Sequence, residues 1–249
     1  MKYLALIPAR FASTRFPGKP LSILGDKPVI QRVYEQAKSA FEEVYVCTDD
    51  ERIYNTVVSF GGKAVMTDNT LRSGTDRCWQ ACERLATDAD VIVNIQGDEP
   101  FVQKSQLESI KECFRDDSTQ IATLVKPFSP SDSQQTLFNP NSPKVVVDKE
   151  MHALYFSRSV IPFLRGVEPE KWLSSHVFYK HIGLYAYRRQ VLHEISMLPP
   201  GVLEKAESLE QLRWLENGYV IKVAVTDVET VGIDTPADLQ RAEEYLKTH

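Results

Sequence analysis

Residues 3–48 read YLALIPARFASTRFPGKPLSILGDKPVIQRVYEQAKSAFEEVYVCT and contain the clearest structural pattern of the chain. The short apolar runs at 3–7 and 43–48 are typical of buried strands. Between them, residues 28–40 carry apolar side chains at helical spacing, and Pro28 suits a first helical turn. A strand, a helix and a second strand in this order predict a parallel pair joined by a crossover helix.

The same alternation continues through the first half of the chain. Further strands are expected at 63–67, 90–96 and 121–128, and further helices at 51–61, 74–86 and 105–116. This pattern is typical of a parallel sheet flanked by helices.

The second half follows a different pattern. Residues 129–143 are rich in Pro, Ser and Asn and are expected to form a loop with at most one short helix. The turn between the apolar runs 144–148 and 152–157 is too short for a crossover helix, so these runs predict an antiparallel hairpin. The remaining expected elements are strands at 179–188 and 219–226 and helices at 189–197, 207–217 and 235–247. The sequence therefore predicts an α/β fold with a Rossmann-like open mixed sheet flanked by helices.

Length and composition limit the class of protein. A chain of 249 residues is long enough for one large core, so we expect a single domain over 1–249. Its net charge of −5 argues against general nucleic-acid binding, which requires a basic face. The opening MKYLALIP is too short an apolar run for a signal peptide or a membrane span, so we expect a cytoplasmic protein. The four cysteines show no zinc spacing and are expected to be reduced thiols.

The loop after the first strand is the first candidate site. Ligands of open α/β sheets bind at the carboxyl ends of the strands, where this loop begins. It matches neither G-x-G-x-x-G nor G-x-x-x-x-G-K-[ST], so glycine amides cannot be its main phosphate ligands. Arg10, Arg15 and Lys19 instead supply three cations to a triphosphate, with hydroxyl donors from Ser13 and Thr14 and with Mg²⁺ to offset the remaining charge. The alternative is a solvated basic loop.

Acidic residues follow two later strands. Asp98 and Glu99 stand directly after the expected strand at 90–96, and Asp234 stands between the last strand and the last helix. Carboxylates at strand ends suit Mg²⁺. The alternatives are an acid that caps the helix after Pro100, and Asp234 or Thr235 as the N-cap before the last helix.

Eight segments in one order make the chain resemble the CMP-sugar-acid nucleotidylyltransferases, a family with the nucleotide-diphospho-sugar transferase type of fold. The segments are IPARFASTRFPGKPL (7–21), SGTDR (73–77), VNIQGDEP (93–100), FNPNSPKVV (138–146), ALYFSRSVIP (153–162), KHIGLYAYR (180–188), LEQLRWLENG (209–218) and GIDTPADL (232–239). One departure is Leu71, where members of this family often have a histidine.

The resemblance implies that CTP reacts with the sugar acid 3-deoxy-D-manno-octulosonate (Kdo) to give CMP-Kdo and pyrophosphate for lipopolysaccharide synthesis. It implies Mg²⁺ as cofactor, with Asp98 and Asp234 as ligands, and Lys19, Arg15 and Asp98 as catalytic residues. It also implies a homodimer, with a smaller substrate-binding and dimerisation subregion at about 140–190. The residues implied for nucleotide binding are Arg10, Ser13, Arg15, Lys19, Ser73, Gly74 and Arg77. Those implied for sugar-acid binding are Gln96, Arg158, His181, Tyr185 and Glu210.

Alternatives remain for residues and for function. Arg158 and Glu210 are also compatible with surface charges, and His181 and Tyr185 with structural residues of a strand. The acceptor is Kdo, or alternatively 8-amino-Kdo, sialic acid or a sugar phosphate. A nucleotide-binding regulator without catalysis is a third hypothesis, whereas a dehydrogenase is disfavoured because its glycine fingerprint is missing.

Overall fold

The computed structural model describes residues 1–12, 15–229 and 232–248. The chain divides into two compact units. Unit 1 comprises Met1–Glu108, Ala186–Ser196 and Thr230–His249, and unit 2 comprises Ser109–Tyr185 and Met197–Glu229. We expected one domain with a smaller substrate-binding and dimerisation subregion at about 140–190, and this stays a prediction.

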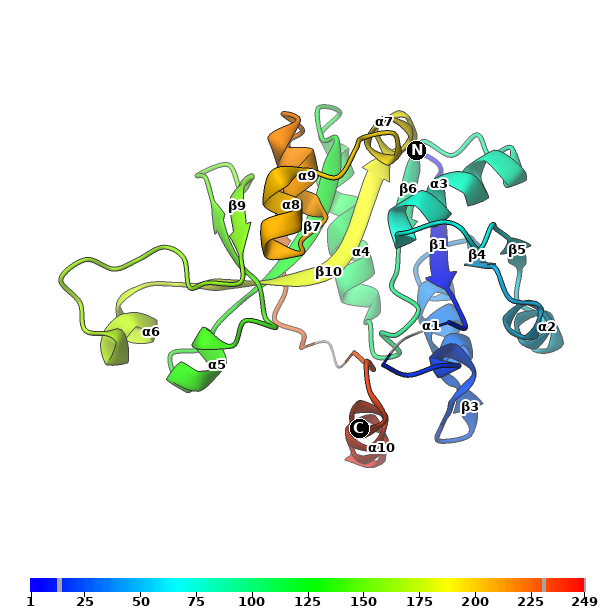
Figure 1. The fold of residues 1–249 in the computed structure, drawn as a ribbon, viewed down its shortest axis with the longest axis horizontal. Coiled ribbons are helices and arrows are strands. Elements are labelled where there is room, and N and C mark those ends of the chain that lie inside the picture. Colours follow the sequence, from blue (N-terminus) through cyan, green and yellow to red (C-terminus); the bar gives the residue numbers. More distant parts are fainter. Residues whose placement is uncertain (13–14, 230–231, 249) are drawn as a thin grey trace. The chain divides into compact units, whose positions relative to one another are not determined.

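Unit 1 contains a parallel sheet with β1 inside it (Figure 1). Its strands, in spatial order, are β6 (Val91–Asn94), β1 (Tyr3–Ala9), β4 (Glu43–Thr48) and β5 (Ala64–Met66). Consecutive residues of β1 and β6 are buried, as expected for strands covered on both faces. The carboxyl ends of β1 and β6 therefore lie side by side.

Helices and short elements complete unit 1. They are α1 (Val29–Lys38), α2 (Glu51–Ser59), α3 (Gly74–Leu85), α7 (Arg189–Ser196), α10 (Pro236–Thr248), the 3₁₀ helix η1 (Lys19–Leu21), and the hairpin of β2 (Ile23–Leu24) and β3 (Lys27–Pro28). Side-chain caps start several of these helices, among them α2 and α3. Asp50 accepts from the Arg52 amide at the start of α2, and Ser73 accepts from the Asp76 amide at the start of α3. The segment SGT lies at the end of β1, because a Cβ at Gly74 would be 3.2 Å from the Pro8 ring.

Unit 2 contains both parallel and antiparallel strand pairs. Its strands are β7 (Ile121–Pro127), β8 (Lys144–Val147), β9 (Ala153–Ser157), the first part of β10 (Tyr179–Arg188) and β11 (Ile221–Val225). β11 is parallel to β7, whereas β8 is antiparallel to both β9 and β10. Its helices are α5 (Gln134–Phe138), α6 (Trp172–Ser175), α8 (Val202–Glu207) and α9 (Gln211–Glu216), with the 3₁₀ helices η2 (Cys113–Arg115) and η3 (Pro169–Lys171). Helix α4 (Lys104–Glu112) and β10 each contain residues of both units.

The predicted α/β fold class with a mixed open sheet is confirmed, and so is the hairpin of β8 and β9. Several boundaries differ by a few residues, and three of the differences affect how an element begins or ends. The helix expected at 105–116 becomes the 3₁₀ helix η2 after Glu112, and the helix expected at 207–217 is α9 alone, with Ser208 in the left-handed conformation after α8. Pro28 is the N-cap of α1, because its extended ψ of 147° keeps it outside the helix.

The four cysteines are free and buried, in agreement with the expected reduced thiols. Among the described residues, no helix combines the length and the apolar character that a membrane crossing needs.

Candidate functional site

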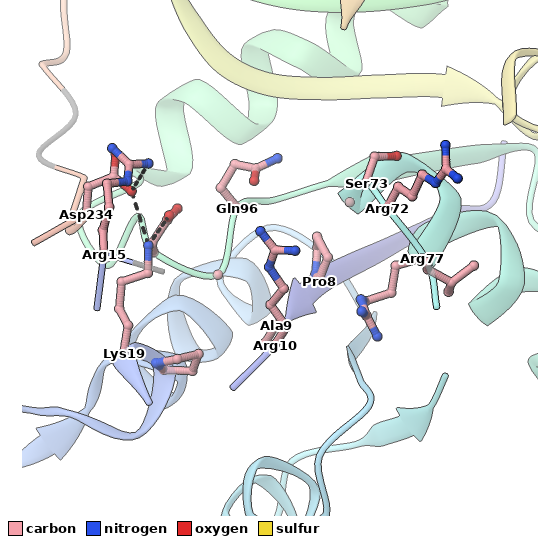
Figure 2. Close-up of a pocket in the computed structure, with 15 residues that line it drawn as sticks. Pro8, Ala9, Arg10, Arg15, Lys19, Arg72, Ser73, Arg77, Gln96 and Asp234 are labelled. Atoms are coloured by element: carbon pink, nitrogen blue, oxygen red, sulfur yellow. Dashed lines mark hydrogen bonds and ion pairs between the residues drawn. The ribbon is translucent and has the colours of Figure 1, made fainter. Parts of the chain in front are cut away.

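A pocket of about 230 Å³ opens in unit 1 where β1 and β6 end. Figure 2 shows Arg15, Lys19 and Asp234 at one end of it, Ser73, Arg72 and Arg77 at the other, and Arg10 and Gln96 between them. The lining residues are Pro8, Ala9, Arg10, Arg15, Lys19, Pro20, Leu71, Arg72, Ser73, Gly74, Arg77, Gln96, Gly97, Asp98 and Asp234. The set contains every described residue that the resemblance assigned to nucleotide or metal binding, but it does not contain Glu99, the other acid considered for Mg²⁺. Ser13 and Thr14 lie outside the described residues.

The cation-bearing loop is closed by its single glycine. The amide of Gly18 donates to the carbonyl of Phe11 at 2.9 Å, and Gly18 has a positive φ of 74° that disfavours other residues. A Cβ at Gly18 would also lie 3.1 Å from the Phe11 ring. The guanidinium of Arg52 lies 3.4 Å from the centre of that ring, and Asp50 holds this guanidinium through Nε and Nη2. Glycine here shapes the loop, and the charged side chains remain to meet a ligand.

Lys19 connects the two aspartates that the sequence proposed as metal ligands. Its Nζ lies 2.6 Å from Asp98 Oδ2 and 3.3 Å from Asp234 Oδ1, and the Lys19 side chain is only 12% exposed. Nη2 of Arg15 lies 3.2 Å from the same oxygen of Asp234. The Ile233 amide donates to the Asp98 carbonyl at 2.9 Å, which holds the two acid-bearing segments together.

Neither Asp98 nor Asp234 acts as a helix N-cap, which was the alternative to metal binding. Thr235 Oγ1 accepts from the Asp238 amide, and Asp238 Oδ2 accepts from the amides of Asp234 and Thr235. Thr235 therefore caps α10 while the Asp234 carboxylate contacts cations. No helix begins near Asp98, because α4 starts at Lys104.

Glu99, the other acid considered for the metal, has a different environment. Desolvation, together with the smaller effects of the charges of Asp98 and Asp234, raises the pKa of its carboxyl to about 8. A carboxyl that is protonated at neutral pH is a poor metal ligand. The electrostatics therefore separate Glu99 from its neighbour Asp98.

The two aspartates have the chemistry of a magnesium site. They converge on one ammonium group, which shows that the position favours a cation. The described residues contain no group of three or more His, Cys, Asp or Glu side chains arranged for a metal ion. Because Mg²⁺ is commonly held by one or two carboxylates together with phosphate oxygens, a pair of aspartates fits such a site when a phosphate supplies the other ligands.

The opposite end of the pocket is built on the start of α3. A Cβ at Gly74 would lie 3.2 Å from the Pro8 ring, so this end is closely packed. Arg77 is 3% exposed and donates to Thr67 Oγ1 and, at 3.1 Å, to Asp49 Oδ2. Its guanidinium is therefore largely occupied by the protein itself.

Arg72 is a pocket residue that the sequence interpretation missed. Within the described part of the chain, neither Arg10 nor Arg72 forms an ion pair, and both are exposed. The only available signal was the position of Arg72 next to the cap Ser73. These two arginines leave unpaired positive charge in the pocket.

Unit 2 brings His181 and Tyr185 together on β10, with ring centres 5.2 Å apart. Thr123 Oγ1 lies 3.0 Å from His181 Nε2, and sequence reasoning did not single out this threonine. Burial lowers the pKa of His181 to about 3, so the imidazole is neutral at pH 7. The pKa of Tyr185 is raised by burial and, to a smaller extent, by the charge of Glu210, which places Glu210 in the same neighbourhood.

Within the described residues Arg158 forms no ion pair, so the alternative of a surface charge pair is not observed, and its guanidinium is not a free fork either. Its Nε donates to the Glu207 carbonyl at 2.6 Å, Nη1 to Pro140 at 2.9 Å and Nη2 to Ser208 at 3.2 Å. A guanidinium has five N–H donors, so one N–H of each terminal nitrogen remains. Glu210, which follows Ser208 by two residues, accepts from Arg213 Nη2 at 2.7 Å.

Residues 4–226 match the family described as Cytidylyltransferase. The chain belongs to the cytidylyltransferase family. As a cytidylyltransferase it is a nucleotidyltransferase enzyme, and its relatives span the same length. A 3-deoxy-manno-octulosonate cytidylyltransferase of Phocaeicola vulgatus is 66% identical over 99% of this chain and 98% of the relative. An 8-amino-3,8-dideoxy-manno-octulosonate cytidylyltransferase of Shewanella amazonensis is 46% identical over 99% of each.

Among solved structures, this cytidylyltransferase is similar to CMP:2-keto-3-deoxy-manno-octonic acid synthetase complexed with CTP. The TM-score is 0.91 and the identity 40%, with 100% of this chain and 99% of that chain covered. The expected nucleotidyltransferase type of fold is therefore confirmed.

Proposed function

We propose that this cytidylyltransferase couples CTP to Kdo, which gives CMP-Kdo and pyrophosphate and activates Kdo for lipopolysaccharide synthesis. The observation that carries the proposal is the contact of Lys19 with both Asp98 and Asp234 in a pocket at the strand ends. This contact places the ammonium group that would stabilise the leaving pyrophosphate beside the two carboxylates that would bind a metal ion. The full-length similarity to relatives named for this reaction supports the choice of substrates.

The nucleotide lies in the unit 1 pocket in this proposal. Arg10, Arg15 and Lys19 bind the phosphates, and Ser13 adds a hydroxyl donor. Ser73, Gly74 and Arg77 hold the nucleoside end. The separation of Lys19 from Ser73 and Arg77 along the pocket supports this orientation (Figure 2).

The reaction joins the C2 hydroxyl oxygen of Kdo to the α-phosphorus of CTP and breaks the bond from that phosphorus to the bridging oxygen of the β-phosphate. Lys19 and Arg15 stabilise the negative charge that develops on pyrophosphate. Asp98 and Asp234 would hold Mg²⁺, which when bound would polarise the α-phosphate, and a second ion would lower the pKa of the attacking hydroxyl. We assign no side chain as a general base, and the hydroxyl proton goes to solvent.

The sugar acid binds through residues that include the unit 2 cluster. The remaining N–H groups of Arg158 suit the carboxylate of Kdo, since guanidinium and carboxylate pair through two hydrogen bonds. His181 uses Nε2 on Thr123, which leaves Nδ1 for a substrate hydroxyl. Tyr185, Glu210 and Gln96 complete the proposed set.

Pyrophosphate release measured with CTP and different acceptors tests the proposal. We expect turnover with Kdo and none with sialic acid or a sugar phosphate. Turnover with 8-amino-Kdo but not with Kdo would instead favour the alternative acceptor, for which the Shewanella amazonensis relative is named. CTP binding without turnover on any acceptor would indicate a regulator, and Asp98→Ala would then leave its function intact.

We further propose a homodimer, supported by exposed apolar side chains in unit 2. Phe138 is 47% and Phe163 is 74% exposed, and both rings contact Trp172. Exposed aromatic clusters of this kind mark interaction surfaces. Sedimentation equilibrium should show a dimer that Phe163→Ser weakens, whereas Val202→Ser, an equally exposed apolar position outside this cluster, should not. We also propose a cytoplasmic location, where CTP is available, which cell fractionation tests.

A further inference from the structure

Lys19 occupies the position at which the two aspartates would meet a divalent ion. Its ammonium contacts one oxygen of each carboxylate, at 2.6 and 3.3 Å, and is mostly shielded from solvent. We infer that Lys19 substitutes for the metal in the nucleotide-free protein, so that a divalent ion and the nucleotide bind together, with Lys19 moving from the aspartates to the phosphates.

Charge balance is the physical reason for this exchange. Two neighbouring carboxylates repel one another unless a cation lies between them, and Lys19 supplies it. A divalent ion on the same two carboxylates would then lie within a few ångströms of the ammonium. Because like charges at this distance repel strongly in a partly desolvated site, the ion and the Lys19 ammonium compete for Asp98 and Asp234.

The nucleotide removes this competition. Its phosphates offer Lys19 new acceptors and offer the ion the oxygen ligands that the protein does not supply. Each ligand therefore binds better when the other is present, which is a positive coupling between the two. The exchange rests on the proposed function in one respect, namely that the phosphates of a nucleotide reach Lys19.

Arg10 provides a matched control for this inference. It lies in the same pocket and carries the same charge, but within the described residues it has no carboxylate partner. Replacing Arg10 by Met removes one positive charge from the pocket, and replacing Lys19 by Met does the same. A difference between the two variants therefore reports the direct contact of Lys19 with Asp98 and Asp234.

The test measures Mn²⁺ binding to the nucleotide-free protein from the electron paramagnetic resonance signal of free Mn²⁺. We expect Lys19→Met to bind Mn²⁺ more tightly than the unsubstituted protein, by about 5- to 150-fold if the coupling is of ordinary size. Lys19→Arg and Arg10→Met should bind Mn²⁺ within about 3-fold of the unsubstituted protein, which is below that range. If Lys19→Met does not fold, Lys19→Gln replaces it, because its amide still donates to one carboxylate.

Thermal unfolding gives a second readout. Without metal, Lys19→Met should unfold at a lower temperature than the unsubstituted protein, and Mn²⁺ should raise its Tm more. Equal Mn²⁺ affinity of Lys19→Met and Arg10→Met would overturn the inference.

The two proposals fail separately. Neither measurement uses Kdo or turnover, so an absence of pyrophosphate release would refute the proposed function and leave the metal exchange standing. Normal pyrophosphate release by the unsubstituted protein, together with Mn²⁺ binding that is unchanged in Lys19→Met, would refute the exchange alone.

Discussion

Gly97→Ala should damage the pocket without touching any charged residue. Gly97 directly precedes Asp98, and a Cβ placed on it would lie 2.7 Å from the carbonyl oxygen of Pro8 in β1. The next nearest atoms, in Ala9 and Ile7, are at 3.5 and 3.6 Å. Ordinary contact needs about 3.5 Å, so the end of β6 must move away from β1 by about 0.8 Å.

Both stability and catalysis should respond to this shift. Overpacking of this kind typically costs about 1–3 kcal/mol, and for a chain of this size each kcal/mol lowers Tm by about 2–4 °C. A fall in Tm between about 2 and 12 °C follows. Misplacing Asp98 by close to 1 Å relative to Lys19 and Arg10 should lower kcat by about 10²-fold.

Thermal unfolding and pyrophosphate release measure these effects, and Gly232→Ala is the matched control. Gly232 lies two residues before Asp234, but a Cβ there meets no described atom within 4 Å. The control should keep its Tm and kcat. If Gly97→Ala also kept both, or if Gly232→Ala lost as much, the close approach of β6 to β1 would not position the site.

Four further predictions concern other parts of the molecule. Gly183 lies between His181 and Tyr185 on the same face of β10, and a Cβ there meets no described atom within 4 Å. The side chain of Gly183→Val would therefore enter the space proposed for Kdo, so it should raise KM for Kdo and leave KM for CTP unchanged; equal changes in both constants would contradict this. The ring resonances of His181 should not titrate between pH 8 and 5, since burial lowers its pKa to about 3. The free energy of unfolding should decrease as the pH falls below 6.5, because only the unfolded state then gains the proton. Burial also lowers the pKa of Lys144, so this side chain binds fewer protons in the folded state than in the unfolded state. The free energy of unfolding of the unsubstituted protein should therefore rise relative to that of Lys144→Met as the pH rises towards 10.5. A difference in urea unfolding that does not depend on pH would refute this. Arg52→Ala should weaken CTP binding, because it removes the contact of the guanidinium with the Phe11 ring in the cation-bearing loop, and Arg52→Lys should recover part of the affinity. Unchanged CTP affinity of Arg52→Ala in calorimetry would show that this contact does not support the loop.

Local sequence pattern was enough for most helices and strands, because hydrophobic periodicity and caps act within a few residues. It was insufficient where backbone geometry decided the boundary. The helix expected at 207–217 is shortened because Ser208 adopts the left-handed conformation after α8, and nothing in the local apolar spacing indicates this.

The candidate site was predicted in its residue types but not in its contacts. The loop cations and the acids at strand ends were recognisable because strand ends collect ligands in this fold class. The sequence could not show that Arg77 is engaged by Thr67 and Asp49, or that Arg158 donates to three backbone carbonyls. Such contacts depend on segments that are distant along the chain.

The order of strands and helices, and the position of Arg10, Arg15 and Lys19 after the first strand, could be predicted before folding was considered, because they follow from side-chain chemistry and short-range spacing. The convergence of Asp98 and Asp234 on Lys19 exists only in the folded chain, since Lys19 is 215 positions from Asp234. The physical reason is that strand pairing and the hydrogen bond from Ile233 to Asp98 bring these distant segments together, and no local pattern encodes that approach.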